Sequence, residues 1–242
     1  MRPVRREASP QVLDFTPYGS AKPYLVSRLG LYCSYCERRV PTNLAIEHLQ
    51  PKGIAKYSHL EEKWDNFLLA CVNCNSAKSD KDVDFAQLFF PDRDNTFAAF
   101  IYLPDGQITA NPGLLPGLVQ IAERTIELTA LNKQVADAHD ENGKLVALDR
   151  FSQRMELWLL AQSALDDWKS GANDTLKRMI VRLAVHSGGF SIWMHTFANE
   201  PTVLPDLIDA FPGTAASNCF NAVGATVSPH PNADLLAGGG KL

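Results

Sequence analysis

The chain has 242 residues, of which 45% are hydrophobic and 21% charged, and its formal net charge is −4. This composition is typical of a globular protein with a sizeable core, and it excludes a collagen-like or wholly disordered chain. No apolar run approaches the roughly 20 residues of a membrane helix, and the N-terminal MRPVRREASP does not resemble a secretory signal, so we expect a cytoplasmic protein.

Charge is distributed unevenly along the chain. Residues 1–63 contain ten Lys and Arg against six Asp and Glu, whereas residues 64–242 contain 13 against 21. The total charge argues against a nucleic-acid binder, but the N-terminal part is locally basic. The most informative residues of the sequence lie in or just after this basic part.

The N-terminal part predicts short elements around two pairs of cysteines. Ser20 and Gly30 are suited to begin and end a helix, and a tight turn then presents Cys33 and Cys36. Alternating apolar residues indicate a strand that Pro51 ends. In chain order, we expect a helix at 20–30, strands at 44–48 and 67–71, and a helix from 73 or 74 to 78.

The rest of the chain predicts a β-hairpin followed by helices. Asp105-Gly106 is a typical hairpin turn, and apolar residues recur at helical spacing after residue 115. Residues 212–242 are rich in Gly, Ala, Asn and Pro, so we expect a flexible tail. The predicted elements are strands at 97–103 and 107–110, helices at 115–139, 148–169 and 173–186, and one or two short helices within 191–211.

The four paired cysteines predict a metal site. Cys33 and Cys36 form one Cys-x-x-Cys pair, and Cys71 and Cys74 form the second. Two such pairs supply four thiolates, which is the ligand set of a closed, structural zinc site. The alternative is four buried cysteines without a metal ion.

Further polar residues occur in a characteristic order between the cysteine pairs and just after them. This order resembles the motif of HNH nucleases, which have a ββα-metal fold, in the variant whose last position is Asn instead of His. The two cysteine pairs flank the motif as they do in zinc-bearing members of that family. The residues that carry the resemblance, all within 33–78, are Glu47-His48, Pro51-Lys52, Asn66, Cys71, Cys74-Asn75 and Lys78.

The resemblance implies a role for each polar residue. His48 would be the general base that activates water, and His suits this role at neutral pH. Glu47 and Asn75 would hold a catalytic Mg²⁺ or Mn²⁺ through oxygen atoms. Asn66 would bond across a loop to hold His48 in place. Many relatives carry Asp at the position of Glu47.

Two lysines are candidates for substrate binding. Lys52 and Lys78 could contact phosphates that flank the cleaved bond, and Asn75 and Lys78 would share one helix face. The alternatives are that both lysines are simply solvated and that Asn75 only caps its helix.

The layout of the whole chain resembles PtuB-type HNH proteins of Septu and retron anti-phage systems. The resemblance lies in the MRPVRRE start, the early HNH motif, and the segments TIELTALN at 125–132 and FSIW at 190–193. It implies an ABC/SMC-like ATPase partner and a role in defence against phage.

We therefore predict an α+β fold with a zinc-stabilised HNH core, a hairpin and a mainly helical C-terminal region. The predicted division is a nuclease domain at 1–95, an accessory and partner-docking region at 96–211, and the tail at 212–242. The predicted activity is endonucleolytic cleavage of DNA. The competing interpretations are an RNase, for example acting on tRNA, and a zinc-knuckle binding module without catalysis.

Overall fold

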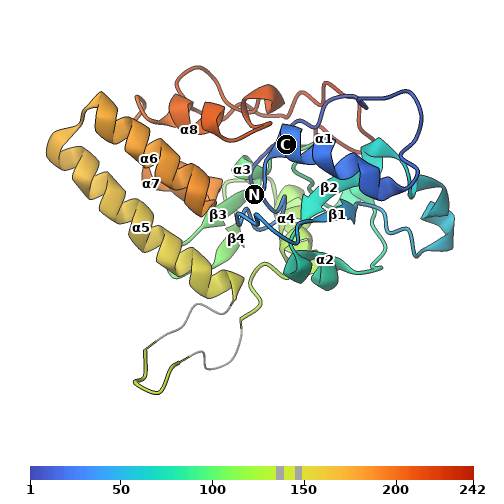
Figure 1. Ribbon diagram of the computed structural model, residues 1–242, viewed down its shortest axis with the longest axis horizontal. Coiled ribbons are helices and arrows are strands. Elements are labelled where there is room, and N and C mark those ends of the chain that lie inside the picture. The colour runs from blue at the N-terminus through green and yellow to red at the C-terminus, as the bar shows by residue number, and fades with distance from the viewer. Residues whose placement is uncertain (135–138, 145–148) are drawn as a thin grey trace.

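The structure is a computed structural model, and it describes residues 1–134, 139–144 and 149–242. Figure 1 shows the short elements of the N-terminal part on the right and a long helical hairpin at the left edge. Both chain ends lie near the centre of this view. Within the described ranges, each helix is too short or too polar to cross a membrane.

Two strands and a helix form the centre of the N-terminal part. The strands pair antiparallel, with Glu47 opposite Leu68 and His48 opposite Phe67. The helix begins two residues after the second strand ends, and this ββα order confirms the prediction for this region. The elements are α1 (Lys22–Leu29), β1 (Ala45–His48), β2 (Phe67–Ala70) and α2 (Val72–Lys78).

A second antiparallel hairpin and a group of helices complete the fold and confirm the α+β class. α5 and α6 form the projecting hairpin of Figure 1, and α7 packs against α5. The elements are α3 (Thr96–Ala99), β3 (Phe100–Tyr102), β4 (Ile108–Ala110), α4 (Pro116–Leu128), α5 (Arg150–Gly171), α6 (Asp174–Ser187), α7 (Phe190–Thr196) and α8 (Leu204–Ala210).

Two predicted boundaries are wrong for local reasons. The strand predicted from residue 97 begins at Phe100, because the side chain of Asn95 accepts a hydrogen bond from the Ala98 amide and caps the short helix α3. The helix predicted to run to residue 139 ends at Leu128, and Ala130 then has a left-handed φ of 48°. Residues 135–138 of that prediction, and residue 148 of the next predicted helix, lie outside the described residues.

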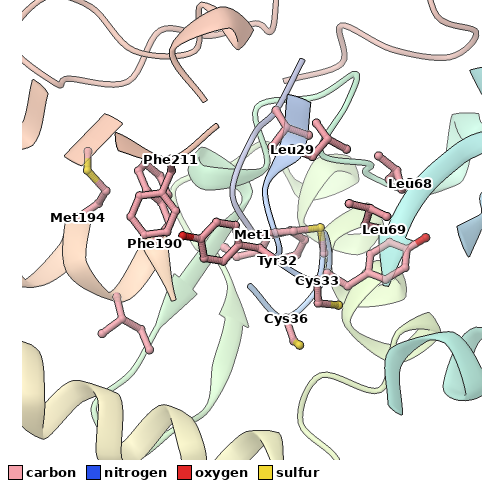
Figure 2. Packing of buried hydrophobic residues seen from close by; sticks show 14 of the residues in the cluster. Met1, Leu29, Tyr32, Cys33, Cys36, Leu68, Leu69, Phe190, Met194 and Phe211 are labelled. Carbon is pink, nitrogen blue, oxygen red and sulfur yellow. The ribbon is translucent and has the colours of Figure 1, made fainter. Parts of the chain in front are cut away.

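One hydrophobic core runs through both parts of the molecule. Figure 2 shows side chains from the cysteine turn and β2 packed in the same region as side chains from α7 and its surroundings. Tyr32 lies 5.1 Å from Phe211 between ring centroids, and Phe211 lies 5.2 Å from Phe190. The predicted boundary between residues 95 and 96 therefore does not separate two cores.

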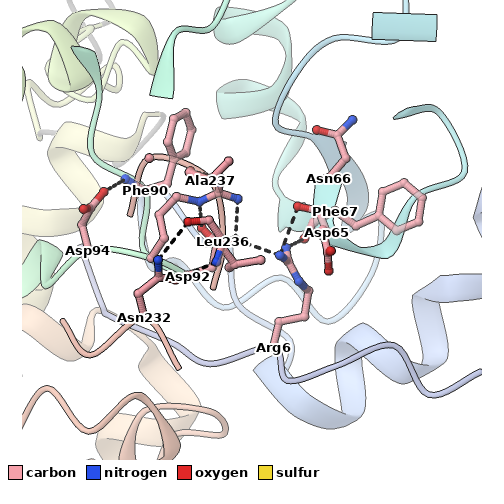
Figure 3. A network of polar contacts seen from close by, with 12 residues as sticks. Arg6, Asp65, Asn66, Phe67, Phe90, Asp92, Asp94, Asn232, Leu236 and Ala237 are labelled. Carbon is pink, nitrogen blue, oxygen red and sulfur yellow. Dashed lines mark hydrogen bonds and ion pairs between the residues drawn. The ribbon is translucent and has the colours of Figure 1, made fainter. Parts of the chain in front are cut away.

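The segment 212–242 packs against the protein, so the prediction of a flexible tail is corrected. Figure 3 shows this segment beside the buried ion pairs near β2. Arg93 donates a hydrogen bond of 2.9 Å to the Ala237 carbonyl, and Arg5 pairs with Asp234 at 2.7 Å. Composition misled the prediction because backbone carbonyls, a few charged side chains and only a few apolar ones, such as Phe220, hold this segment.

The tail contact can be tested at Lys241. Its ammonium lies 2.9 Å from Asp94, whose side chain is fully buried. Lys241→Ala leaves that carboxylate without its ion pair, and we expect a loss of about 1–3 kcal/mol of unfolding free energy in urea denaturation. Leu235→Ala, in the same segment but 89% exposed, is the control and should change stability by less than about 0.5 kcal/mol. Equal stability of the two variants would contradict a docked tail.

Candidate active site and metal centre

The cysteine pairs come from two turns that the fold brings together. The first pair lies in the turn after α1, where the Cys33 amide donates to the Arg38 carbonyl. In the second pair, Cys71 is the N-cap residue of α2 and Cys74 lies in its first turn. The Ser34 amide donates to the carbonyl of Leu69 in β2, which holds the first turn beside the second.

The four sulfur atoms have the arrangement of a tetrahedral metal site. All four cysteines are buried, and their Sγ atoms lie within 4.8 Å of one another, with 3.7 Å between Cys36 and Cys71. A tetrahedral zinc site with Zn–S bonds of about 2.3 Å has sulfur–sulfur edges of about 3.8 Å. The four sulfur atoms are therefore close enough together to hold a zinc ion after small side-chain adjustments.

Glu47 is buried on the face of β1 that meets α2. Its Oε1 lies 2.8 Å from the Lys78 ammonium and 3.4 Å from the Tyr35 hydroxyl. Burial raises the pKa of Glu47, and Lys78 opposes that effect. Oε2 has no hydrogen-bond partner within the ranges that the structure describes, so this oxygen is available to a cation.

Lys78 is placed differently from the prediction. Its side chain is 1% exposed, and besides the Glu47 carboxylate it contacts the His48 carbonyl, to which it donates a hydrogen bond of 2.8 Å. The prediction that Lys78 lies at the surface and binds a flanking phosphate is therefore corrected. Its ammonium joins the end of α2 to the two polar residues at the end of β1.

His48 projects from the opposite face of β1 to Glu47, as alternation along a strand requires. Its Nε2 lies 2.9 Å from the Glu61 carbonyl. A carbonyl only accepts, so Nε2 carries the proton and Nδ1 has the free lone pair in the neutral ring. The ring packs edge-on against Tyr18, 4.8 Å away, and Phe67, 5.2 Å away. Burial lowers the pKa of His48, which keeps the imidazole neutral near pH 7.

Asn66 connects the two segments that flank His48. Its Oδ1 accepts from the Gln50 amide at 2.8 Å, and its Nδ2 donates to the Gln50 carbonyl at 2.9 Å and to the Leu60 carbonyl at 3.2 Å. Leu60 immediately precedes Glu61, whose carbonyl holds the His48 ring. These bonds support the positioning role that the resemblance implies for Asn66.

Asn75 lies inside α2 and does not cap it, since Cys71 occupies the N-cap position. Its side chain is half-buried and makes no hydrogen bond to other residues in the described ranges. The carboxamide oxygen is therefore available as a ligand. Asn75 lies three residues before Lys78, which places both near the same side of the helix. No hydrogen bond within the described ranges joins the His48 ring to Glu47 or Asn75.

Lys52 lies at the surface near His48. Its ammonium pairs with the Glu61 carboxylate at 2.7 Å and lies 4.2 Å from the centre of the Tyr18 ring. Both members of the ion pair are more than one-third exposed, so the pair contributes little to stability. Lys52 can therefore exchange Glu61 for a phosphate at low energetic cost.

Sequence reasoning missed two contacts to this site. The Glu61 carbonyl orients His48, but a backbone carbonyl is present at every position and gives no sequence signal. Arg150, the first residue of α5, donates to the Cys74 sulfur at 2.8 Å. The two residues are 76 positions apart, and a positively charged residue at a helix start is not by itself a signal for such a contact.

Residues 33–81 match the protein-family model described as HNH endonuclease. A search of curated proteins found no match to the chain. The matched segment contains both cysteine pairs, the β1–β2 hairpin and α2, which is the ββα unit described above. The chain thus carries an HNH endonuclease domain at residues 33–81, and this domain indicates an enzyme that hydrolyses phosphodiester bonds.

Proposed function

We propose that the chain is a metal-dependent endonuclease that cleaves DNA, with His48 as the general base. The observation that carries the proposal is the hydrogen bond between His48 Nε2 and the Glu61 carbonyl. This bond fixes the tautomer and leaves Nδ1 free to take a proton from water. The water oxygen then bonds to phosphorus while the bond from phosphorus to the leaving oxygen breaks.

Glu47 and Asn75 are the residues that would hold the catalytic ion. The free Oε2 of Glu47 and the amide oxygen of Asn75 are hard donors, which Mg²⁺ and Mn²⁺ prefer. When bound, such an ion neutralises charge on the phosphate and the leaving oxygen. Lys78 keeps the Glu47 carboxylate in place through Oε1, so Oε2 would remain free to bind the ion.

DNA is the proposed substrate, and binding would begin at the basic N-terminal part. Lys52 is exposed beside the imidazole and is the described lysine best placed to meet a phosphate next to the cleaved bond. The acidic remainder of the chain is less suited to a long nucleic-acid groove. A partner that helps to hold the substrate would compensate for this small basic surface.

We further propose a prokaryotic anti-phage role in the cytoplasm together with an ABC/SMC-like ATPase. The support is the resemblance of the whole chain to PtuB-type proteins and the form of the helical region. Leu159, Met179 and Leu183 on α5 and α6 are exposed apolar side chains, which are suited to protein docking.

The catalytic role is tested by His48→Ala. Removing a general base costs about 10²–10⁴-fold in rate, and we expect plasmid cleavage to fall by at least that lower factor. Metal analysis should find the zinc content unchanged, because His48 is not a ligand of the sulfur cluster. His59→Ala is the matched control, since His59 is an exposed histidine in the neighbouring loop. If His48→Ala cuts as fast as His59→Ala, the assignment of the base is wrong.

The substrate class is tested by parallel incubation with plasmid DNA and with total tRNA. We expect plasmid cleavage with Mg²⁺ or Mn²⁺ and none with a chelator that leaves the zinc bound. Cleavage of tRNA alone would establish the RNase alternative. Binding without cleavage of either substrate, under all metal conditions, would favour the zinc-knuckle binding module.

The partner is tested by co-expression with an ATPase encoded beside the gene. We expect the two proteins to co-purify, and we expect Met179→Asp combined with Leu183→Asp to abolish the complex because charge is placed on an apolar docking face. Val223→Asp is the control, an exposed apolar position outside α5 and α6. Co-purification that is unaffected by the double variant would remove the docking face from the proposal.

A further inference from the structure

Among the residues that the structure describes, Arg150 is the basic residue whose side chain donates a hydrogen bond to the sulfur cluster. Its Nη1 donates to Cys74 Sγ at 2.8 Å and to the Thr129 carbonyl at 3.0 Å, and its Nη2 donates to the Ala130 carbonyl. The residue is 5% exposed. One guanidinium thus connects the metal ligands, the C-terminal end of α4 and the first residue of α5.

The sulfur cluster needs compensating charge when it binds metal. Four thiolates around Zn²⁺ carry a net charge of −2, and here all four sulfur ligands are buried. Buried charge is costly unless it is paired and hydrogen-bonded. A guanidinium supplies both a positive charge and an N–H donor to sulfur, and Arg150 is placed to do this for Cys74.

We propose that Arg150 is an outer-sphere positioning residue of the Cys33–Cys36–Cys71–Cys74 metal site, which strengthens metal binding and couples it to the docking of α5. The inference goes beyond the nuclease function and does not depend on it. It does depend on metal binding by the four cysteines. Partners of this kind typically change metal affinity by about 10–100-fold when they are removed.

The same helix offers a matched comparison at Arg154. This side chain lies one turn after Arg150 and is equally buried, at 5%. It donates to the Gly106 carbonyl at 2.7 Å and to the Leu131 carbonyl at 2.8 Å, and it makes no hydrogen bond to a cysteine of the cluster. Arg150 and Arg154 thus bind neighbouring carbonyls. Of the two, only Arg150 donates a hydrogen bond to a metal ligand, whereas Arg154 acts on Cys36 through its charge alone.

A cavity beside the cluster affects the choice of experiment. It measures about 320 Å³, and Cys36, Arg38, Arg150 and Arg154 are among its lining residues. Removing the Arg150 side chain would enlarge it and let a chelator reach the metal faster. Rates of metal loss therefore do not separate the inference from simple access, whereas equilibrium affinity and the spectrum of bound metal do.

The test compares the full-length chain with Arg150→Met, Arg150→Lys and Arg154→Met. Zinc affinity is measured by equilibrium competition with a chelator, and Co²⁺ is substituted to record its sulfur-to-metal charge-transfer band. We expect Arg150→Met to lose about 10–100-fold in zinc affinity and to shift the band to longer wavelength, since a thiolate without its hydrogen bond is a better electron donor. Arg150→Lys should show smaller changes, because it keeps the charge.

Arg154→Met should lose stability and clearly less zinc affinity than Arg150→Met, and it should keep the position of the band, because it removes a nearby charge but no hydrogen bond to sulfur. Equal effects of Arg150→Met and Arg154→Met would overturn the inference and leave Arg150 a purely structural residue. If Arg150→Met does not fold, an unchanged affinity and spectrum in Arg150→Lys would overturn the inference, and an intermediate change would support it. Absence of a tetrahedral thiolate spectrum in the original chain would overturn the metal site itself, whatever the nuclease assays show.

Discussion

The convergence of four sulfur atoms is the constraint on which the candidate active site depends. Strands of four residues and a helix of seven are too short to be stable alone. A metal ion bound to these sulfurs would contribute folding free energy at the point where β2 turns into α2. The cluster thereby fixes the start of α2 relative to the first cysteine turn. The opposite end of the same helix then brings Lys78 to the end of β1.

Each side chain proposed for catalysis is held by a segment that is remote from it in sequence. Lys78 holds the Glu47 carboxylate from α2, and the Glu61 carbonyl holds the His48 ring from the loop between the strands. Asn66 in turn holds the residue before Glu61. The proposed metal ligand Glu47 and the proposed base His48 would therefore have their orientation set before substrate binds. Such preorganisation is a main source of enzymatic rate enhancement, because the polar groups do not have to reorganise during the reaction.

The sequence predicted the ββα unit and its cysteine pairs correctly, because the spacing of apolar residues and the spacing of metal ligands both indicate the same local structure there. The two cysteine pairs, the strand that ends at His48 and the helix that ends at Lys78 were all predictable, because ligand spacing and alternation are local signals. The inward orientation of Lys78 was not, since the same i,i+3 spacing with Asn75 fits a solvated helix face and a buried one. Burial of a lysine depends on a partner, and that partner, Glu47, lies on another element.

The docked tail shows why composition alone fails. A segment rich in Gly and Pro has few side chains to bury, yet its backbone can satisfy buried charges elsewhere. Asp92 pairs with both Arg6 and Arg93 at 3.0 Å, and Arg93 also needs the Ala237 carbonyl. The positions of these charges become known only once distant segments have met. The sequence therefore predicted a flexible tail at residues 212–242, whereas in the fold this segment covers a buried network of ion pairs.

The shared core changes the role of the helical region. A domain of 1–95 alone would expose surfaces that α7 and its neighbours cover, since Tyr32 packs against Phe211 beside the first cysteine turn. The buried Glu37 of that turn accepts hydrogen bonds from the amide and hydroxyl of Ser191 at 2.7 and 2.6 Å. The same carboxylate also pairs with the Met1 ammonium at 3.1 Å and accepts from the Tyr102 hydroxyl at 3.0 Å, so loss of Ser191 would remove two of its several polar partners. The helical region therefore stabilises the cysteine turn, and any docking of a partner to its outer face would act on the nuclease domain through this same interface.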